Sequence, residues 1–487
     1  KSNVLTGTWK ANDSASLGAP SDKVTYRFPF AGNPVTQNIP FVLSVPDDTL
    51  TAKPGTGWPV VIYQHGIFGS RGHSLPMGNA LGAACLSPSA PAGTGCFATI
   101  AIDQPLHGIG ATEGNQVVNP FLALSVDVDA SNDFAARDWT GTPYEGLQER
   151  HFGWSKTSDL DSTPTAMSYS TELASADGFA GEFYINLALP PASRDNLRQS
   201  AMDLMTLVAS LKDVDLDGDG AGDFDTDKVY FIGHSLGGIV GTTFASTNND
   251  ANVLAFNAGE LVGLGAVALP TSGGQIIRIL ENSPSLNAPI LGGLSLAGID
   301  QGSSSFEIFM NTSQAAVDSG DSINFAQLLA DTGTPILATE IYGDGSDRDT
   351  QDQTIPINTD SVDGAYLAQR GTALNAPLGG TEPFISELDL DNATTAGLYV
   401  NPDDPTAAVQ AVVRFNSGTH NGIFSGQDPI LLTETATQFA SFFSDITTNG
   451  AGRGVLVGVA TADSDGDGIP DTPTATIISD AEPDISE

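Results

Sequence analysis

Short runs of apolar residues, each bounded by turn-forming residues, recur along the whole chain. Their length and their β-branched content predict buried strands at 60–63, 97–102, 229–232, 264–269, 335–342 and 409–415. Apolar positions at helical spacing lie between several of them, at 75–84, 196–212, 236–245 and 432–443. This alternation predicts an α/β fold, a mostly parallel sheet with helices on both faces.

Two long insertions interrupt the alternation. Residues 108–193 are polar and aromatic, whereas residues 273–329 are apolar and rich in glycine. The large apolar side chains of the second insertion include Ile276, Ile277, Ile279, Leu280, Leu291 and Leu294. We predict one α/β domain over 1–450 with a cap at about 108–193, a lid at about 273–329 that contacts the substrate, and a tail at 451–487. A helical cap that never moves is the alternative to a lid.

The composition restricts the possible partners. The 487 residues include 18 basic and 58 acidic side chains, which give a net charge of −40. Nucleic acids and anionic membrane surfaces would be repelled, so an uncharged substrate is favoured. No apolar stretch reaches the roughly 18 residues that a transmembrane segment needs. The acidic residues are spread over the whole chain, which indicates a saline habitat or an acidic secreted protein.

Residues 233–237, Gly-His-Ser-Leu-Gly, match the pattern Gly-x-Ser-x-Gly. They follow a predicted strand and precede a helix of small residues, whereas the similar sequence at 293–297 has neither flank. A serine on such a tight turn projects above the sheet, and the glycines leave room for the turn. We predict that Ser235 is the catalytic nucleophile and that the N–H of Leu236 binds the oxyanion. An ordinary helix cap is the alternative.

The second donor of the oxyanion hole is expected after the strand at 60–63. His65-Gly66 follows that strand, and glycine lets the backbone approach a substrate. The residue after His-Gly would supply the N–H group, which favours Ile67 over Phe68.

Chain order identifies the base. Of the six histidines, only His420 follows Ser235, and it lies in a loop after a predicted strand. For the acid, the loop after the strand at 335–342 offers several aspartates. Asp352 fits best because Asp-x-x-Ile-Pro predicts a turn followed by extended chain, and Asp347 is second. The acid would orient the His420 imidazole as it accepts the serine proton.

Two acidic loops share the spacing D-x-D-G-D-G-x-x-D, at 215–223 and 463–471. Alternating carboxylates form an oxygen cage that suits a hard cation, and Ca²⁺ fits better than Mg²⁺ because the ligands are many and flexible. The predicted Ca²⁺ ligands are Asp215, Asp217, Asp219, Asp223, Asp463, Asp465, Asp467 and Asp471. A solvated acidic turn is the alternative for each loop.

The two cysteines, Cys85 and Cys96, enclose a short loop of Pro, Gly and Ser. This spacing suits a local disulfide, which forms in an oxidising compartment. Two unpaired buried thiols are the alternative. An acidic chain with a disulfide favours a secreted location.

The Ser235 turn, the His65-Gly66 loop and the His420 loop, in this order, resemble the α/β-hydrolase superfamily over roughly residues 24–443. The segments 57–66 and 194–199 and the first acidic loop look like those of the large extracellular bacterial lipases and phospholipases of the VolA type. Members of that group are often surface lipoproteins. The second acidic loop is similar to a thrombospondin type 3 calcium repeat.

These observations predict a secreted lipase or esterase that cleaves apolar esters through an acyl-enzyme on Ser235. A phospholipase, a lysophospholipase or a hydrolase of aliphatic polyesters would have the same chemistry. A calcium-stabilised binding protein on an inactive hydrolase scaffold is the alternative from another class.

Overall fold

The computed structural model describes residues 2–5, 7–11, 24, 31–32, 36–109, 127–128, 134–135, 140–141, 149–151, 154–156, 165–166, 180–343, 348–358, 378–394, 396–426 and 428–458. The chain forms two compact units. The first consists of Lys1–Val42, Ile67–Gly72 and Ile102–Ser200, and the second of Leu43–Gly66, His73–Ala101 and Ala201–Glu487.

The first unit contains short strands. β1 (Ser2–Asn3), β7 (Trp154–Lys156) and β8 (Thr165–Ala166) form one small sheet, and β5 (Asp127–Val128) pairs with β6 (Phe134–Ala135). Its interior holds a charged network, in which the buried Arg71 binds the carboxylates of Asp103 and Glu149. The predicted cap, 108–193, falls within this unit, and only part of it is among the described residues.

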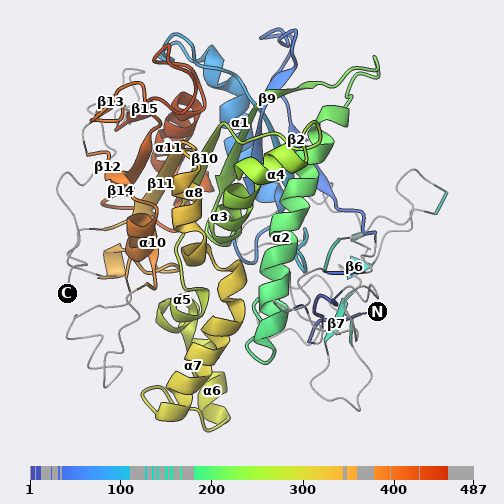
Figure 1. Cartoon of the computed structure of the whole chain (residues 1–487), viewed down its shortest axis with the longest axis vertical. Helices are drawn as coiled ribbons and strands as arrows, with labels where there is room; N and C mark the ends of the chain where they lie inside the picture. Colours follow the sequence, from blue (N-terminus) through green and yellow to red (C-terminus); the bar gives the residue numbers. More distant parts are fainter. Residues whose placement is uncertain are drawn as a thin grey trace. The chain divides into compact units, whose positions relative to one another are not determined.

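An eight-stranded sheet forms the centre of the second unit (Figure 1). Its strands lie in the order β12-β14-β11-β10-β9-β3-β4-β2. They are β2 (Phe41–Ser44), β3 (Trp58–Gln64), β4 (Ala98–Ile102), β9 (Phe224–Gly233), β10 (Ala266–Pro270), β11 (Ile336–Ile341), β12 (Asp391–Asn392) and β14 (Gln410–Phe415). Each neighbouring pair from β12 to β4 is parallel.

Helices connect these strands. The α-helices are α1 (Leu75–Ala83), α2 (Pro190–Ser210), α3 (Leu236–Asn248), α4 (Ala251–Phe256), α5 (Ile276–Asn282), α6 (Asn287–Leu296), α7 (Ser304–Val317), α8 (Ala326–Asp331), α10 (Thr381–Glu387) and α11 (Pro429–Phe442). Short 3₁₀ helices are η2 (Arg71–Ser74), η3 (Ala84–Leu86), η5 (Leu211–Asp213), η6 (Asp318–Gly320), η7 (Ser322–Asn324), η8 (Arg348–Thr350) and η9 (Gly422–Phe424).

Alternation along β9 shows that helices cover both faces of the sheet. Tyr230 stacks on Phe443, just after α11, with ring centroids 5.0 Å apart. The next residue, Phe231, points to the other face and packs on Phe244 of α3. This is the mostly parallel α/β sheet with helices on both faces that the sequence predicts, and that part of the fold prediction is confirmed.

The second insertion is helical from α5 to α8. Asp321 accepts the backbone N–H groups of Gln275 and Ile276 and thereby caps the start of α5. Helices α5, α6 and α7 group together at one end of the unit (Figure 1). Whether this segment moves as a lid stays a prediction.

The first eight residues of the predicted tail pack in the second unit. β15 (Val455–Val457) pairs antiparallel with β13 (Gly397–Tyr399), and Val455 and Val457 are fully buried. Residues 459–487, which include the second acidic loop, lie outside the described residues.

Candidate active site

Ser235 lies on a strained turn between β9 and α3. Its φ of 56° and ψ of −122° are unusual for a residue with a side chain, and such strain is concentrated at functional sites. The neighbouring loop contacts it, because a Cβ added to Gly66 would lie 3.0 Å from the Ser235 Cβ and 3.4 Å from its Oγ. The turn therefore places the Ser235 hydroxyl beside Gly66.

The two glycines of the motif are required by close backbone contacts. A Cβ on Gly233 would meet the carbonyl oxygen of Gly237 at 2.5 Å. A Cβ on Gly237 would collide with the carbonyl oxygen of Gln64. Each glycine thus allows the turn to close against its neighbours, which is the physical basis of the Gly-x-Ser-x-Gly spacing.

Asp352 and His420 are brought together by loops that follow β11 and β14. The His420 Nδ1 lies 2.7 Å from the Asp352 Oδ2, and both side chains are buried. The other carboxylate oxygen of Asp352 accepts the N–H groups of Thr354 (2.7 Å) and Ile355 (3.0 Å). The loop thus fixes the acid while leaving one oxygen for the imidazole. Asp347, the second candidate, lies outside the described residues.

His234 links this pair to the nucleophile turn. Its Nε2–H donates to the carbonyl oxygen of His420 (3.1 Å), and the two rings lie 5.0 Å apart between centroids. Burial, together with the nearby His420, lowers the pKa of His234 well below its ordinary value. His234 is therefore neutral, and its hydrogen bond holds the His420 loop next to the turn that carries Ser235. The motif marks this position only as "x", so its role could not be predicted from the sequence pattern.

Of the candidate oxyanion donors, Leu236 belongs to the second unit, whereas Ile67 and Phe68 belong to the first. Leu236 is the first residue of α3, where N–H groups lack partners within the helix. In the first unit, the Phe68 N–H donates to the Nε2 of His107 at 3.3 Å, and the His107 Nδ1–H donates to Pro105. Because Phe68 is engaged in this way, Ile67 stays the favoured second donor, as a prediction.

The first acidic loop gathers three of its four predicted ligands. Oxygens of Asp215, Asp217 and Asp223 lie within 4.8 Å of one another, whereas Asp219 is outside this group and accepts a backbone N–H of its own loop. Lys53 binds Asp223 and also Asp217, with 3.0 Å between its Nζ and the Asp217 Oδ2. Its hydrogen bonds to these carboxylates raise the Lys53 pKa. The oxygen set suits Ca²⁺, and such a cation would replace the Lys53 ammonium.

The expected disulfide between Cys85 and Cys96 is present. It joins η3 to Cys96, which lies two residues before β4. In the part of the chain that the structure describes, no helix is long and apolar enough to cross a membrane.

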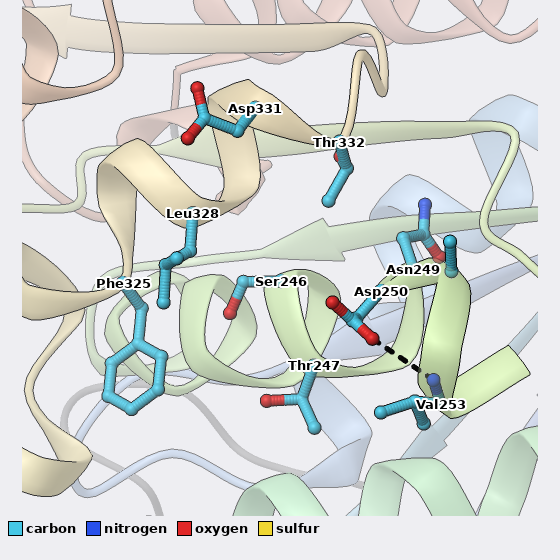
Figure 2. Close-up of a pocket in the computed structure, with 10 residues that line it drawn as sticks. Ser246, Thr247, Asn249, Asp250, Val253, Phe325, Leu328, Asp331 and Thr332 are labelled. Carbon is cyan, nitrogen blue, oxygen red and sulfur yellow. Dashed lines mark hydrogen bonds between the residues drawn. The ribbon is translucent and has the colours of Figure 1, made fainter. Parts of the chain in front are cut away.

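A hollow of about 470 Å³ lies at the other end of α3 from Ser235. Figure 2 shows Ser246 and Thr247 of α3 and Leu328 of α8 among the side chains that line it, with Asp250 occupied in capping α4. The helix is about 20 Å long, and no histidine is among the ten lining residues. The hollow is therefore separate from the candidate active site.

The predicted lid residues in α5 and those in α6 differ in burial. Ile276, Ile277 and Ile279 of α5 are buried. In α6, no residue is buried, and its Leu291 and Leu294 are only half-buried. The two leucines of α6 are therefore more accessible to another molecule than the three isoleucines of α5.

Comparison with known proteins gives only distant similarities. No protein-family model and no curated protein matches the sequence. Among solved structures, the acylaminoacyl peptidase of Pyrococcus horikoshii is 10% identical with a TM-score of 0.36, and the match covers 84% of this chain but 40% of the peptidase. The chain thus spans about two fifths of that protein.

Two esterases match over most of their length. The esterase of the archaeon Pyrobaculum calidifontis is 12% identical, with 85% of each chain covered and a TM-score of 0.30. One of two fungal esterases from Rhizomucor miehei is 11% identical, with 83% of this chain and 84% of that chain covered and a TM-score of 0.31. Similarities this distant carry no argument about activity, which depends on the site geometry.

Proposed function

We propose that this chain is a serine carboxylic ester hydrolase that uses Ser235, His420 and Asp352. The observation that carries the proposal is the 2.7 Å contact between His420 and Asp352, held by His234 beside the strained Ser235 turn. A nucleophile, an orienting acid and a base, in the chain order Ser, Asp, His, are the parts of an acyl-transfer site.

In the proposed reaction, the Ser235 Oγ attacks the ester carbonyl carbon while the His420 Nε2 accepts the hydroxyl proton. Asp352 accepts the Nδ1–H and stabilises the imidazolium that forms. The Leu236 N–H, with Ile67 as the predicted second donor, binds the oxyanion. The C–O bond then breaks and His420 protonates the leaving alcohol. A water molecule, deprotonated by His420, attacks the acyl-enzyme and releases the carboxylic acid and Ser235.

The apolar surface of α6 supports a lipase or esterase that acts on apolar esters. Residues 282–299 contain no charged side chain, although the chain has a net charge of −40. Leu296 at the end of α6 is 93% exposed, and Ile308 of α7 is 67% exposed. Exposed apolar side chains that gather into a patch commonly mark a contact with an apolar ligand. Phospholipase and polyester hydrolase activities are the alternatives that share this chemistry.

The test is a panel of esters of rising acyl length, with and without phosphate head groups. We expect hydrolysis of uncharged esters that Ser235→Ala abolishes while the variant keeps the wild-type melting temperature. Preference for phosphate head groups would instead favour the phospholipase alternative. Full activity in Ser235→Ala would contradict the mechanism, and no turnover of any ester would favour the inactive binding protein.

We infer a secreted location from the disulfide and the acidic composition. The resemblance to VolA-type extracellular enzymes agrees with this location. Fractionation of the native host and detection of the chain outside the cytoplasm would test it.

We also propose that the two acidic loops bind Ca²⁺ as a structural ion. Three carboxylates in the first loop offer oxygen ligands, and Lys53 competes for two of them. Lys53→Met should therefore increase the Ca²⁺ affinity of this loop, as measured by calorimetric titration. Truncation after Gly458 should remove one bound ion and retain β15. An unchanged stoichiometry after truncation would contradict the second site.

A further inference from the structure

A buried cluster of charged side chains lies between the strands that lead to Asp352 and His420. Arg414 of β14 is opposite Glu340 of β11 in the sheet register, and its Nε donates to the Glu340 Oε1 at 2.6 Å. The same Nε donates to the Oε1 of Glu382 in α10 (2.7 Å), and the Nη2 donates to the Oε2 of Glu382 (2.8 Å). All three side chains are at most 6% exposed.

The charges in this cluster do not balance unless one carboxyl group holds a proton. Arg414 also donates to Asn392 of β12 and lies over the Tyr342 ring. Among the groups that contact the cluster in the described residues, Arg414 is the only cation. Burial and the adjacent Glu382 raise the pKa of Glu340 well above its ordinary value. Glu382 forms the two-bonded ion pair, and Glu340 is the neutral member.

The cluster is connected to the acid through two backbone contacts. Glu340 is followed by Ile341, whose carbonyl oxygen accepts the Asp352 N–H at 3.0 Å. At the other end of the same loop, the Glu382 N–H donates to the Ile357 carbonyl oxygen at 2.7 Å. The loop that carries Asp352 is therefore held at both ends by residues of the cluster or their neighbours.

The base is connected through β14. Arg414 is followed by Phe415, whose carbonyl oxygen accepts the N–H groups of Tyr342 (2.8 Å) and Gly343 (3.1 Å) after β11. His420 lies five residues beyond Phe415. A shift of Arg414 along its strand would therefore move the start of the His420 loop relative to the strand that leads to the acid.

We propose that Glu340, Arg414 and Glu382 form a positioning clamp that sets the contact between Asp352 and His420. The clamp consists of these three residues and acts through β11, β14 and α10, because none of them is bonded to the acid or the base. The inference rests on the proposed function, in which that contact orients the catalytic base.

The test compares two isosteric changes in the full chain. Glu382→Gln breaks the ion pair and leaves Arg414 buried without its counter-charge, whereas Glu340→Gln preserves the neutral member. Glu387→Gln, at the end of the same helix and outside the clamp, is the matched control. We measure kcat and KM on a soluble ester, thermal unfolding, and the low-field ¹H signal of the Nδ1–H that His420 shares with Asp352.

We expect Glu382→Gln to lower kcat on the order of tenfold with little change in KM, because a displacement of about 1 Å at a catalytic group can cost roughly 100-fold. The ¹H signal should shift or broaden in the same variant. Glu340→Gln should lower kcat less than about threefold by the same reasoning, and Glu387→Gln should behave as wild type.

Two results would overturn the clamp. In one, Glu382→Gln lowers the melting temperature but leaves kcat and the ¹H signal unchanged at temperatures where it is folded. In the other, Glu340→Gln is as harmful as Glu382→Gln, which would mean that Glu340 carries the essential charge. If Arg414→Lys folds, its single ammonium cannot make the paired contacts with Glu382, so it should match Glu382→Gln.

The ¹H signal separates failure of the clamp from failure of the proposed function. If the wild type hydrolyses no ester, the function is wrong, yet the signal still reports whether the clamp sets the Asp352–His420 contact. If the wild type is active and the signal is unchanged in Glu382→Gln, the function stands and the clamp is wrong.

Discussion

The candidate active site and helix α6 follow opposite structural rules. At the site, Asp352 is fixed by backbone N–H groups on one oxygen and by His420 on the other. In α6, no side chain is buried, and Leu296 is almost fully exposed. The first region holds polar groups in one arrangement, as acyl transfer requires, whereas the second leaves apolar groups available to a partner.

The largest expected effect is at the site. Asp352→Asn should lower kcat by up to about 10⁴, because it removes the carboxylate that orients and stabilises the His420 imidazole. The measurement is kcat on a soluble ester, with folding checked by circular dichroism. Asp347→Asn is the control. If Asp347→Asn loses activity and Asp352→Asn keeps it, the acid is misassigned and the enzyme class survives.

The next prediction separates α5 from α6 by stability. Ile277→Ala should lower the free energy of unfolding by roughly 2–5 kcal/mol, because Ile277 is fully buried and its loss leaves a cavity. Leu296→Ala should change it by less than about 0.5 kcal/mol, since the side chain is exposed. Denaturant titration measures both. Similar losses in the two variants would show that α6 is packed against something in solution.

A smaller and selective effect is expected from α6. Replacement of both Leu291 and Leu294 by Ser should lower kcat/KM for long-chain esters more than for acetyl or butyryl esters. Each CH₂ that loses its apolar contact costs about 0.8 kcal/mol, which corresponds to roughly fourfold in kcat/KM. Equal losses across the ester series would mean that these residues stabilise the fold and do not bind the acyl chain.

The sequence predicted those features that depend on local backbone constraints. Gly233 and Gly237 lie in a turn that leaves no room for a larger residue. Their spacing alone therefore predicts the turn. The pattern Asp-x-x-Ile-Pro predicts a turn at Asp352 followed by extended chain, and in the structure Asp352 accepts the N–H groups of Thr354 and Ile355. The apolar runs predicted the strands for the same reason, since burial on both faces requires continuous hydrophobicity.

Features that depend on contacts between distant segments were not predictable. Arg414 and Glu340 are separated by 74 residues, and neither belongs to a motif. The pairing of Lys53 with Asp223 likewise joins segments 170 residues apart. Helices α5 and α6 are both apolar, so composition could not indicate that one is buried and the other exposed. One sequence shows which residues are apolar or charged, but only the fold shows which of them meet.

The most direct test of the central claim is covalent labelling with a fluorophosphonate, which reacts with activated serines, followed by peptide mass spectrometry. The account predicts one phosphonate per chain, on the peptide that contains Ser235, and no label in Ser235→Ala or after heat unfolding. His420→Ala should also lose the label, because Ser235 then lacks its base. Equal labelling of Ser235→Ala, or a label on Ser295 in the wild type, would contradict it.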